Sequence, residues 1–460
     1  MSRPLAYLRR CYLGALWLLL LAFGFGSAQA TVSDERATVA VVGPVIGWGA
    51  NTRGQLGTNP SARIARPMLV NELGGVIAVA AGADHSLALL RDGTVRAWGA
   101  NDAGQLGDGT TLSRALPVIV EGLSDVIAIA AGGRFSLALR RDGAVFAWGR
   151  NNVGQLGVAT SDFCPIDSVL PCSSHPLPVA GLSAITAIAA GGAHSLGLRQ
   201  DGVVLAWGDN QYGQIGRTAV DTCMLGGTLS ACARAPIPIV GLDPAITIAA
   251  GSTHSVAITA DRRVQAWGDN STGQVGEAAT DVCTTQRRSC AIAPVTVPGV
   301  ADAIAIAAGG THSLALLQDG RVQAFGYEPE LGLGTANPRP HPSAVVVPGL
   351  RRIVAIAVGR AFSVVTDADG RVWAWGLDDV GQLGYGLEPN DPCLLPRCTL
   401  VPAPALTHDL VAIAAGQDFV LAIQRTTLPG LPNTGDGWSA TRDQVRASEH
   451  PAPMLVGWQP

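Results

Sequence analysis

Short apolar segments alternate with glycine-rich turns along most of the chain, and residues 76–120 show this pattern clearly. Val76–Ala81 is a run of small and branched apolar residues, and His85–Leu90 is a second apolar segment. Thr94–Trp98 alternates with a period of two, which is typical of a strand with one buried face. Asp92-Gly93 predicts a hairpin turn before this third strand, because glycine tolerates a positive φ.

The unit continues with a glycine-rich loop at Gly104–Gly107 and a fourth apolar segment at Pro117–Val120. Proline at the start of that strand would remove no hydrogen bond from the sheet. Four short antiparallel strands in one unit predict a propeller blade.

The unit repeats at intervals of about 50 to 60 residues, a period that indicates a propeller or a solenoid. Its landmark is an aromatic residue followed by glycine, with the aromatic residue at Trp48, Trp98, Trp148, Trp207, Trp267, Phe325 and Trp375. We expect these aromatic residues to be structural, because their large surface suits burial between sheets.

The two ends of the repeat region complement each other. The first Trp-Gly pair, at Trp48, has no Ala-Gly-x-x-His-Ser segment before it, and the last such segment, at Ala415–Phe419, has no Trp-Gly after it. We therefore expect a strand at about Val39–Trp48 to complete the blade that begins near Val411–Ile423. Such pairing would leave no free sheet edge between the ends.

The combined motif is Gly-x-x-His-Ser, then Asp-Gly, then Trp-Gly-x-Asn-x-x-Gly-Gln-Leu-Gly. It resembles the repeat of the regulator of chromosome condensation family over residues 39–425. The resemblance implies an all-β, seven-bladed β-propeller over residues 31–425, closed by its terminal segments in one blade. Two departures stand out: Asp261-Arg262 replaces one Asp-Gly, and Tyr327–Gly332 has lost the Asn and Gln of the sixth loop, keeping Leu333-Gly334.

Repeated amides follow each Trp-Gly pair, and we expect them to hold the loops through hydrogen bonds to the backbone. The asparagines are Asn51, Asn101, Asn151, Asn210 and Asn270, and the glutamines are Gln55, Gln105, Gln155, Gln214, Gln274 and Gln382.

Residues 1–30 are predicted to be a signal peptide, with a basic start, an apolar run at Leu13–Phe25 and a small-residue cleavage site at Ala28-Gln29-Ala30. A retained membrane anchor is the alternative, but the apolar run is short for a span. We expect a secreted, periplasmic or cell-surface protein without a stable membrane anchor. Removal of the signal peptide leaves 28 arginines against 35 acidic residues, a net charge of −7 that disfavours nucleic-acid binding.

The cysteines of the predicted mature chain form four close pairs in the segments between the third and fourth strands of their blades. The pairs are Cys164/Cys172, Cys223/Cys232, Cys283/Cys290 and Cys393/Cys398. An even number of cysteines in an exported chain predicts disulfides, and zinc is the alternative. These excursions, expected to have no core of their own, would emerge on one face and present rigid loops to a partner, or only protect against proteolysis.

Composition and motifs give no candidate for catalysis or for a cofactor. The chain has no lysine, which excludes Schiff-base and phosphate-loop lysines. His85, His194, His254 and His312 occupy one repeat position, but Phe135, Phe362 and Phe419 fill it elsewhere, so we expect packing and no metal site. The serine after each histidine points to the opposite face of its strand, so the adjacent residues form no nucleophile–base pair.

Residues 426–460 lack the repeat and are predicted to be a disordered tail or the end of a truncated fusion. Leu431–Gly435 resembles a sortase sorting signal, but a polar sequence follows it in place of the apolar stretch and basic end that sorting needs.

The function predicted from these features is a secreted, monomeric, non-catalytic propeller that binds an unidentified protein outside the cytoplasm. Inhibition of an extracellular enzyme is a specific version, because the family includes propellers that inhibit β-lactamases. Family resemblance also implies an alternative, nucleotide exchange on the small GTPase Ran, which export and acidic charge disfavour. A hydrolase on a propeller is the third possibility, since fold alone does not decide function.

Overall fold

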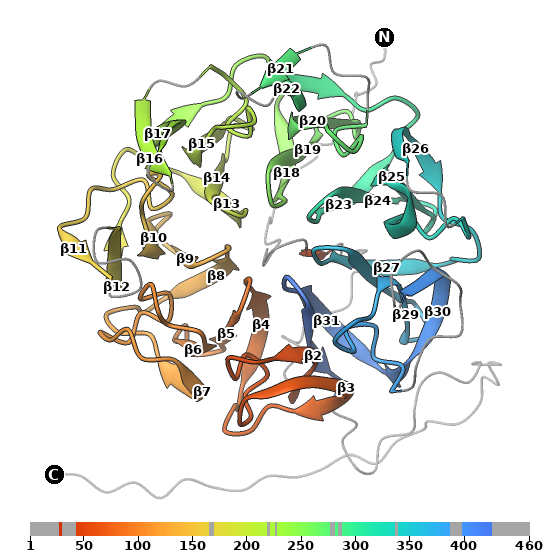
Figure 1. The fold of residues 1–460 in the computed structure, drawn as a ribbon, viewed down its shortest axis with the longest axis horizontal. Coiled ribbons are helices and arrows are strands. Elements are labelled where there is room, and N and C mark those ends of the chain that lie inside the picture. The colour runs from red at the N-terminus through yellow and green to blue at the C-terminus, as the bar shows by residue number, and fades with distance from the viewer. Residues whose placement is uncertain are drawn as a thin grey trace, which may run out of the picture. The chain divides into compact units, whose positions relative to one another are not determined.

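The computed structural model describes residues 27–29, 43–164, 170–218, 221–225, 228–276, 281–283, 288–335, 339–386 and 398–425. Their strands form seven antiparallel sheets around a central axis (Figure 1). Each sheet is one blade, numbered I to VII around the ring, and these residues contain no α-helix. The predicted all-β, seven-bladed propeller is confirmed.

Three blades have four strands, which follow one another from the axis outward. Blade I comprises β31 (Leu410–Ala415), β32 (Phe419–Gln424), β2 (Val45–Asn51) and β3 (Ser61–Leu69). Blade II comprises β4 (Val76–Ala81), β5 (His85–Leu90), β6 (Val95–Gly99) and β7 (Arg114–Ile119). Blade VI comprises β23 (Ala303–Ala308), β24 (His312–Leu317), β25 (Val322–Tyr327) and β26 (Pro340–Val346), with the 3-10 turn η2 (Glu328–Glu330) after β25.

Four blades have a fifth strand. Blade III comprises β8 (Val126–Ala131), β9 (Phe135–Arg140), β10 (Val145–Arg150), β12 (Pro171–Pro178) and β11 (Asp162–Phe163). Blade IV comprises β13 (Ile185–Ala190), β14 (His194–Arg199), β15 (Val204–Asp209), β17 (Thr228–Pro238) and β16 (Asp221–Leu225). Blade V comprises β18 (Ala245–Ala250), β19 (His254–Thr259), β20 (Val264–Asp269), β22 (Arg288–Thr296) and β21 (Asp281–Cys283). Blade VII comprises β1 (Ser27–Gln29), β27 (Ile353–Val358), β28 (Phe362–Asp367), β29 (Arg371–Leu377) and β30 (Cys398–His408).

The ends of the repeat region close the ring as predicted. β2 pairs antiparallel with β32, with Trp48 opposite Val420 and Gly49 opposite Phe419. The strand begins at Val45 rather than at Val39, and residues 39–42 lie outside the described part of the chain. The orange β2 and the blue β31 therefore belong to one blade in Figure 1.

β1 lies at the axis, where it pairs with β27 beside β23 and β31. Its residues belong to the segment predicted to be removed before Thr31. Closure of the ring does not use β1, because the contact between β2 and β32 is made without it.

The fourth strand of blade II starts earlier than predicted. β7 begins at Arg114, so Pro117 lies inside the strand, beside the register shift between Ala97 and Gly99. β7 is the outermost strand of its sheet, and an edge strand tolerates the missing N–H of proline.

A shared carbonyl joins each blade to its neighbour. The main-chain oxygen of Gln55 in blade I accepts hydrogen bonds from Nε1 of Trp98, at 2.8 Å, and from Oγ of Ser86, at 2.7 Å, both in blade II. The equivalent carbonyl of other blades accepts a hydrogen bond from the indole of the next blade. The pairs are Trp148–Gln105, Trp207–Gln155, Trp267–Gln214, Trp375–Glu330 and Trp48–Gln382. The six tryptophans of these pairs and Phe325, which takes the same position in blade VI, are fully buried.

The glycine of the Gln-Leu-Gly sequence makes room for that indole. A Cβ atom on Gly107 would lie 2.8 Å from Nε1 of Trp148, and Gly107 has a φ of 68°. In blade VI the equivalent residue is Gly332, whose Cβ would lie 2.9 Å from Nε1 of Trp375. Leu331-Gly332 therefore replaces Leu-Gly of the other loops, and the prediction that Leu333-Gly334 does so is wrong.

A second ring of backbone hydrogen bonds surrounds the axis. The residue after the glycine that ends each first strand donates its N–H to a carbonyl of the next blade. The donor–acceptor pairs are Gln417–Gly82, Ala83–Gly132, Gly133–Gly191, Gly192–Gly251, Ser252–Gly309, Gly310–Gly359 and Arg360–Gln417. Every blade takes part, so each one is tied to both of its neighbours at the axis.

We expect Trp148→Phe to destabilise the protein by about 1–2 kcal/mol, because it deletes the indole donor while keeping an aromatic ring. Trp148→Ala should cost about 3–5 kcal/mol, because it also opens a cavity. Urea unfolding of both variants measures the difference. Blade VI already carries Phe325 at this position, so Trp148→Phe is compatible with the fold; an unchanged free energy of unfolding would contradict a role for the hydrogen bond.

A candidate binding face built from loops

Two kinds of connection emerge on the same face of the propeller, which we call the loop face. One joins the first strand of a blade to the second, and the other joins the third strand to the fourth. They touch in each blade: the N–H of Ala100 donates to the oxygen of Asp84 at 2.8 Å, and the N–H of Arg150 to the oxygen of Arg134 at 2.9 Å. The opposite face, which we call the turn face, carries the Asp-Gly turns and the connections between blades.

Amide side chains hold the loops after Trp-Gly, as predicted. Oδ1 of Asn101 accepts the N–H of Leu106 at 2.9 Å, while its Nδ2 donates to the oxygen of Thr110 at 3.0 Å. Oε1 of Gln105 accepts the N–H of Ala103 at 2.8 Å. Both bonds to the loop N–H groups recur for Asn51 and Gln55, Asn151 and Gln155, Asn210 and Gln214, and Asn270 and Gln274.

Blade VI holds its loop with carboxylates instead. Glu328 is buried at the position of the asparagine, where it accepts from Arg339 Nε at 2.7 Å and also contacts Thr335 and His341. Burial alone would raise the pKa of Glu328, but hydrogen bonds from these three side chains outweigh it and lower the pKa. The sixth loop is therefore differently built, not unsupported.

Three of the predicted disulfides lie within the described residues: Cys164–Cys172, Cys223–Cys232 and Cys283–Cys290. Each bridges a hairpin that adds the fifth, outermost strand to blade III, IV or V. Cys398 is also disulfide-bonded, and its predicted partner Cys393 lies outside the described residues.

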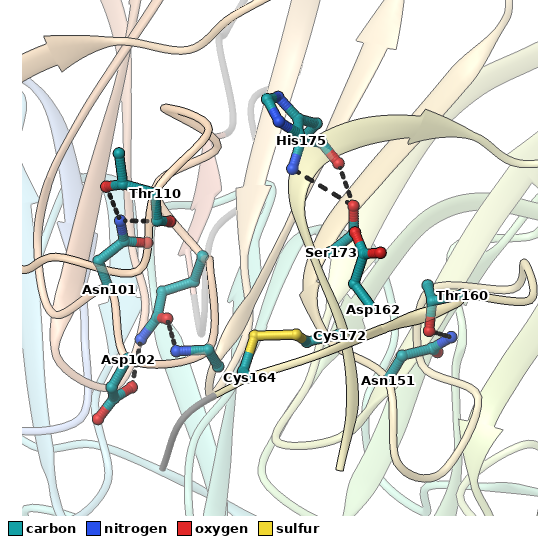
Figure 2. The surroundings of a disulfide bond; sticks show 12 residues. Asn101, Asp102, Thr110, Asn151, Thr160, Asp162, Cys164, Cys172, Ser173 and His175 are labelled. Carbon is teal, nitrogen blue, oxygen red and sulfur yellow. Dashed lines mark hydrogen bonds between the residues drawn. A yellow bond between two sulfur atoms is a disulfide. The ribbon is translucent and has the colours of Figure 1, made fainter. Parts of the chain in front are cut away.

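The bridged hairpins are anchored to the propeller, which the sequence alone did not reveal. All seven cysteines in the described residues are buried. Cys223 and Cys232 pack on Val153, from the loop of the preceding blade. Figure 2 shows Cys164–Cys172 between the loop of blade II, with Asn101 and Asp102, and Asn151 of its own blade. The excursions, predicted to have no core of their own, are thus packed against loops of the propeller.

An Asp-x-Cys sequence begins all four cysteine pairs, at Asp162, Asp221, Asp281 and Asp391, and is a signal that the repeat motif does not contain. Two of these aspartates, Asp221 and Asp281, accept hydrogen bonds from the neighbouring strand. Asp221 accepts the N–H of Arg234 at 2.9 Å, and Asp281 accepts the N–H of Ile292 at 3.0 Å. Each of these two residues thereby ties its outer strand to the neighbouring strand, two residues past the second cysteine.

The hairpins expose apolar side chains. Phe163 next to Cys164 is 60% exposed, Leu229 in the hairpin of blade IV is 75% exposed, and Val282 next to Cys283 is 55% exposed. Blades III, IV and V are consecutive, so these side chains follow one arc of the outer edge, where β11, β16 and β21 lie in Figure 1. We call them the apolar arc.

The histidines of the repeat join neighbouring blades. Nε2 of His85 in blade II lies 2.9 Å from Oγ of Ser136 in blade III. Ser136 donates its only hydroxyl proton to the carbonyl of Gln105 at 2.9 Å, so Nε2 of His85 must be the donor to Ser136. The pairs His194–Ser255, His254–Ser313 and His312–Ser363 repeat this contact.

A serine–histidine contact thus exists, but between blades and not between adjacent residues. Phe362 takes the histidine position in blade VII. The next blade, blade I, has Val420 in place of the serine, so the one blade without a serine follows a blade with phenylalanine. Among the described residues, no group of three His, Cys, Asp or Glu side chains is placed to hold a metal. The histidines act as links between sheets.

Burial keeps three of these histidines neutral. It lowers the pKa of His85 to about 4, slightly opposed by the charge of Asp102. Burial likewise lowers the pKa values of His194 and His254 to about 3. Each ring is fully enclosed, so protonation would place a charge where water does not reach.

One histidine also has a carboxylate neighbour. Oε2 of Glu330 lies 3.0 Å from Nδ1 of His312, whose Nε2 lies 2.8 Å from Oγ of Ser363. Carboxylate, imidazole and hydroxyl in this order activate the serine of many hydrolases. Ser363 and His312 are 0% exposed, and the other three His–Ser pairs have the same geometry without the carboxylate. The arrangement is thus a variant of the link between blades, with the hydroxyl sealed from substrate.

Partly buried carboxylates stand near the axis on the loop face. Burial raises the pKa of Asp84 and of Asp418, and nearby arginines, including Arg360 at 2.9 Å from Asp418, act in the opposite direction. Burial also raises the pKa of Asp209 to about 6, against hydrogen bonds from the backbone and from Gln214. The face therefore carries an uneven pattern of charge around a common scaffold.

In the described part of the chain, no helix is long and apolar enough to cross a membrane.

Acid should destabilise the wild-type protein more than the variant His254→Phe. The folded pKa of His254 lies below the usual value of 6.5, so between pH 6.5 and about 3 the unfolded chain binds more protons and stability falls as the pH falls. Between pH 7 and pH 5, His254 should lower the free energy of unfolding of the wild type by ~2 kcal/mol, a loss that the variant does not suffer.

Asp209 acts in the opposite direction, because its raised pKa makes the folded protein bind the extra proton in this pH range. Asp209 is present in both proteins, so comparing their urea unfolding at the two pH values isolates the effect of His254. Phenylalanine already fills the same position at Phe135, Phe362 and Phe419. Equal losses of stability in the two proteins would contradict a neutral, buried His254.

Comparison with known proteins agrees with this architecture. The sequence model of the RCC1-like domain matches residues 27–291, and models of the regulator of chromosome condensation (RCC1) repeat match residues 303–329, 353–382 and 369–423. The protein pim1 of Schizosaccharomyces pombe is 36% identical over 159 residues, which are 33% of this chain and 27% of pim1. The guanine nucleotide exchange factor SRM1 of Saccharomyces cerevisiae is 34% identical over 145 residues, 31% of this chain and 28% of SRM1.

Solved structures show the same fold. Prp20p of Saccharomyces cerevisiae superposes with a TM-score of 0.68 at 25% identity, covering 87% of this chain and 93% of Prp20p. Human WBSCR16 superposes with a TM-score of 0.69 at 21% identity, covering 83% of this chain and all of that one. The matched segments span little more than a quarter of the two yeast relatives in sequence. With its family model matched over more than half of its length, the chain belongs to the RCC1-like domain family.

Proposed function

We propose that this chain is a secreted, non-catalytic propeller that binds a folded protein partner on its loop face. The observation that carries the proposal is the set of disulfide-bridged hairpins on consecutive blades, each of which exposes an apolar side chain. Exposed apolar side chains on neighbouring rigid loops offer a partner apolar surface to bury.

Rigidity supports binding at this face. Each bridge closes a short loop, which stabilises it by about 2–3 kcal/mol relative to a flexible excursion. The loops beneath are fixed by the asparagine and glutamine hydrogen bonds, such as those of Asn101 and Gln105. A surface that is ordered before binding loses less conformational entropy when a partner docks.

The disulfides also support a location outside the cytosol, because thiols in the cytosol are kept reduced. The predicted signal peptide agrees with this, although residues 1–26 lie outside the described part. A partner that is itself an extracellular enzyme would be inhibited wherever the apolar arc covered its active site.

A second candidate function comes from the relatives. SRM1 is named as a guanine nucleotide exchange factor, and the study of Prp20p concerns its binding to Gsp1p and histones. By this alternative, the chain would bind a small GTPase and release its nucleotide. The disulfides weigh against it, since such partners reside in a reducing compartment.

The triple variant Phe163→Ser, Leu229→Ser and Val282→Ser should lose its partner, because it replaces the apolar arc with polar groups. The mature, oxidised protein is immobilised and used to capture proteins from the native secretome, which are identified by mass spectrometry. We expect a protein enriched at least tenfold on the wild type relative to the triple variant.

Val240→Ser is the matched control, since Val240 is 61% exposed in a connection between blades on the turn face. It should retain the partner. Equal capture by the wild type and the triple variant would contradict the proposal that the apolar arc binds the partner.

Release of a fluorescent nucleotide from purified Gsp1p tests the alternative. The proposed function predicts no acceleration by the oxidised chain, with SRM1 as the positive control. Acceleration that approaches that of SRM1 would replace the extracytosolic proposal with nucleotide exchange.

A further inference from the structure

We propose that the loop face holds a binding site for a small oxyanion, a carboxylate or a phosphate, near the axis of the propeller. A cavity of about 260 Å³ opens there, lined by side chains that include Arg134, Arg150, Asn152, Gln155 and Gln417. The site belongs to the chain alone, so it does not depend on the protein partner proposed above.

Two arginines meet at this cavity in one blade only. Arg134 lies in the connection between β8 and β9, and Arg150 ends β10, so both belong to blade III. The residues equivalent to Arg134 in the other blades are Asp84, Ala193, Thr253, Thr311, Ala361 and Asp418. Those equivalent to Arg150 are Ala50, Ala100, Asp209, Asp269, Tyr327 and Leu377. No repeat requirement explains the arginines, since the fold accepts small, acidic or apolar residues at both positions.

Among the described residues, no carboxylate lines the cavity, although acidic residues lie close to it. Asp102 has its Oδ2 atom 3.9 Å from Nη1 of Arg134 but does not reach the cavity wall. Asp84 and Asp102 face the same arginine electrostatically from blade II. The two guanidinium groups therefore line the cavity, while these two acidic residues lie outside its lining and partly balance the charge of Arg134.

A buried amide donor adds a second, independent observation. Asn152 is only 7% exposed, and its Oδ1 accepts a hydrogen bond from Nε2 of Gln155 at 3.2 Å. Its Nδ2 has no acceptor among the described residues. Leaving a buried donor unpaired is costly, and an acceptor brought by a bound ligand would satisfy this group.

The donor set defines the ligand. Two guanidinium groups and one amide offer N–H donors and positive charge, while the described lining side chains present no anionic acceptor. An acceptor-only anion of small size completes this set, and guanidinium groups match the paired oxygens of carboxylates and phosphates. A metal cation or an ammonium group would be repelled.

The test is calorimetric titration of the purified oxidised chain with citrate and, separately, with inorganic phosphate, at constant ionic strength. At least one should bind saturably, and the stronger of the two identifies the preferred oxyanion. Arg134→Gln should weaken that binding at least about tenfold, because it removes a charged donor. Arg141→Gln, an exposed arginine at a turn of the opposite face, should leave it unchanged.

Asn152→Asp provides the sharpest variant, because the chain already tolerates aspartate at this loop position. Asp102 in blade II and Asp379 in blade VII accept from Gln105 and Gln382 as Asn152 accepts from Gln155. The variant should fold normally and lose anion binding, whereas Asp102→Asn should strengthen it. Absence of saturable binding by both probes, or equal binding by wild type and Asn152→Asp, would overturn the proposal.

Discussion

The interaction on which the propeller depends is the hydrogen bond from a buried indole to the main-chain carbonyl of the preceding blade. Trp98 reaches the oxygen of Gln55, and Ser86 donates to the same atom. In blades I to V, Asn and Gln side chains fold the loop so that this carbonyl points at the neighbour. An open stack of the same units would leave an indole at one end and a carbonyl at the other without partners, whereas a closed ring brings Trp48 to Gln382. Closure by β2 and β32 thus satisfies the motif as well as the sheet.

The sequence predicted this scaffold well because each part of the repeat has a local physical meaning. Period-two segments, Asp-Gly turns and Trp-Gly pairs predicted the strands of blade II nearly as observed. What could not be predicted depends on contacts between blades. The bond between His85 and Ser136 joins residues 51 positions apart, and no spacing within one unit reveals it. The prediction for the sixth loop was wrong because a deletion moved the structural Leu-Gly to Leu331-Gly332.

The disulfides show the same limit. Pairing and placement between the third and fourth strands followed from the cysteine spacing, and three bridges confirm it. The added outer strands, and the packing of Cys223 and Cys232 on Val153, did not follow from that spacing. Burial against a neighbouring loop is a tertiary fact, which depends on how two blades are oriented. The apolar arc could not be predicted from the sequence for the same reason. The exposure of Phe163 depends on the hairpin that carries it.

The use of main-chain acceptors explains how one scaffold tolerates a varied surface. Glu330 replaces glutamine in blade VI, yet its carbonyl still receives Trp375 at 2.9 Å. Because the link between blades requires the loop path and not the side chain, residues that point away from it are free to differ from blade to blade. Arg134 and Arg150 in blade III and Asp418 in blade I illustrate this freedom on the loop face. The axial hydrogen-bond ring ties all seven blades near the axis, and the described disulfides bridge the outer hairpins of blades III, IV and V, so the proposed binding would depend mainly on which side chains these loops display.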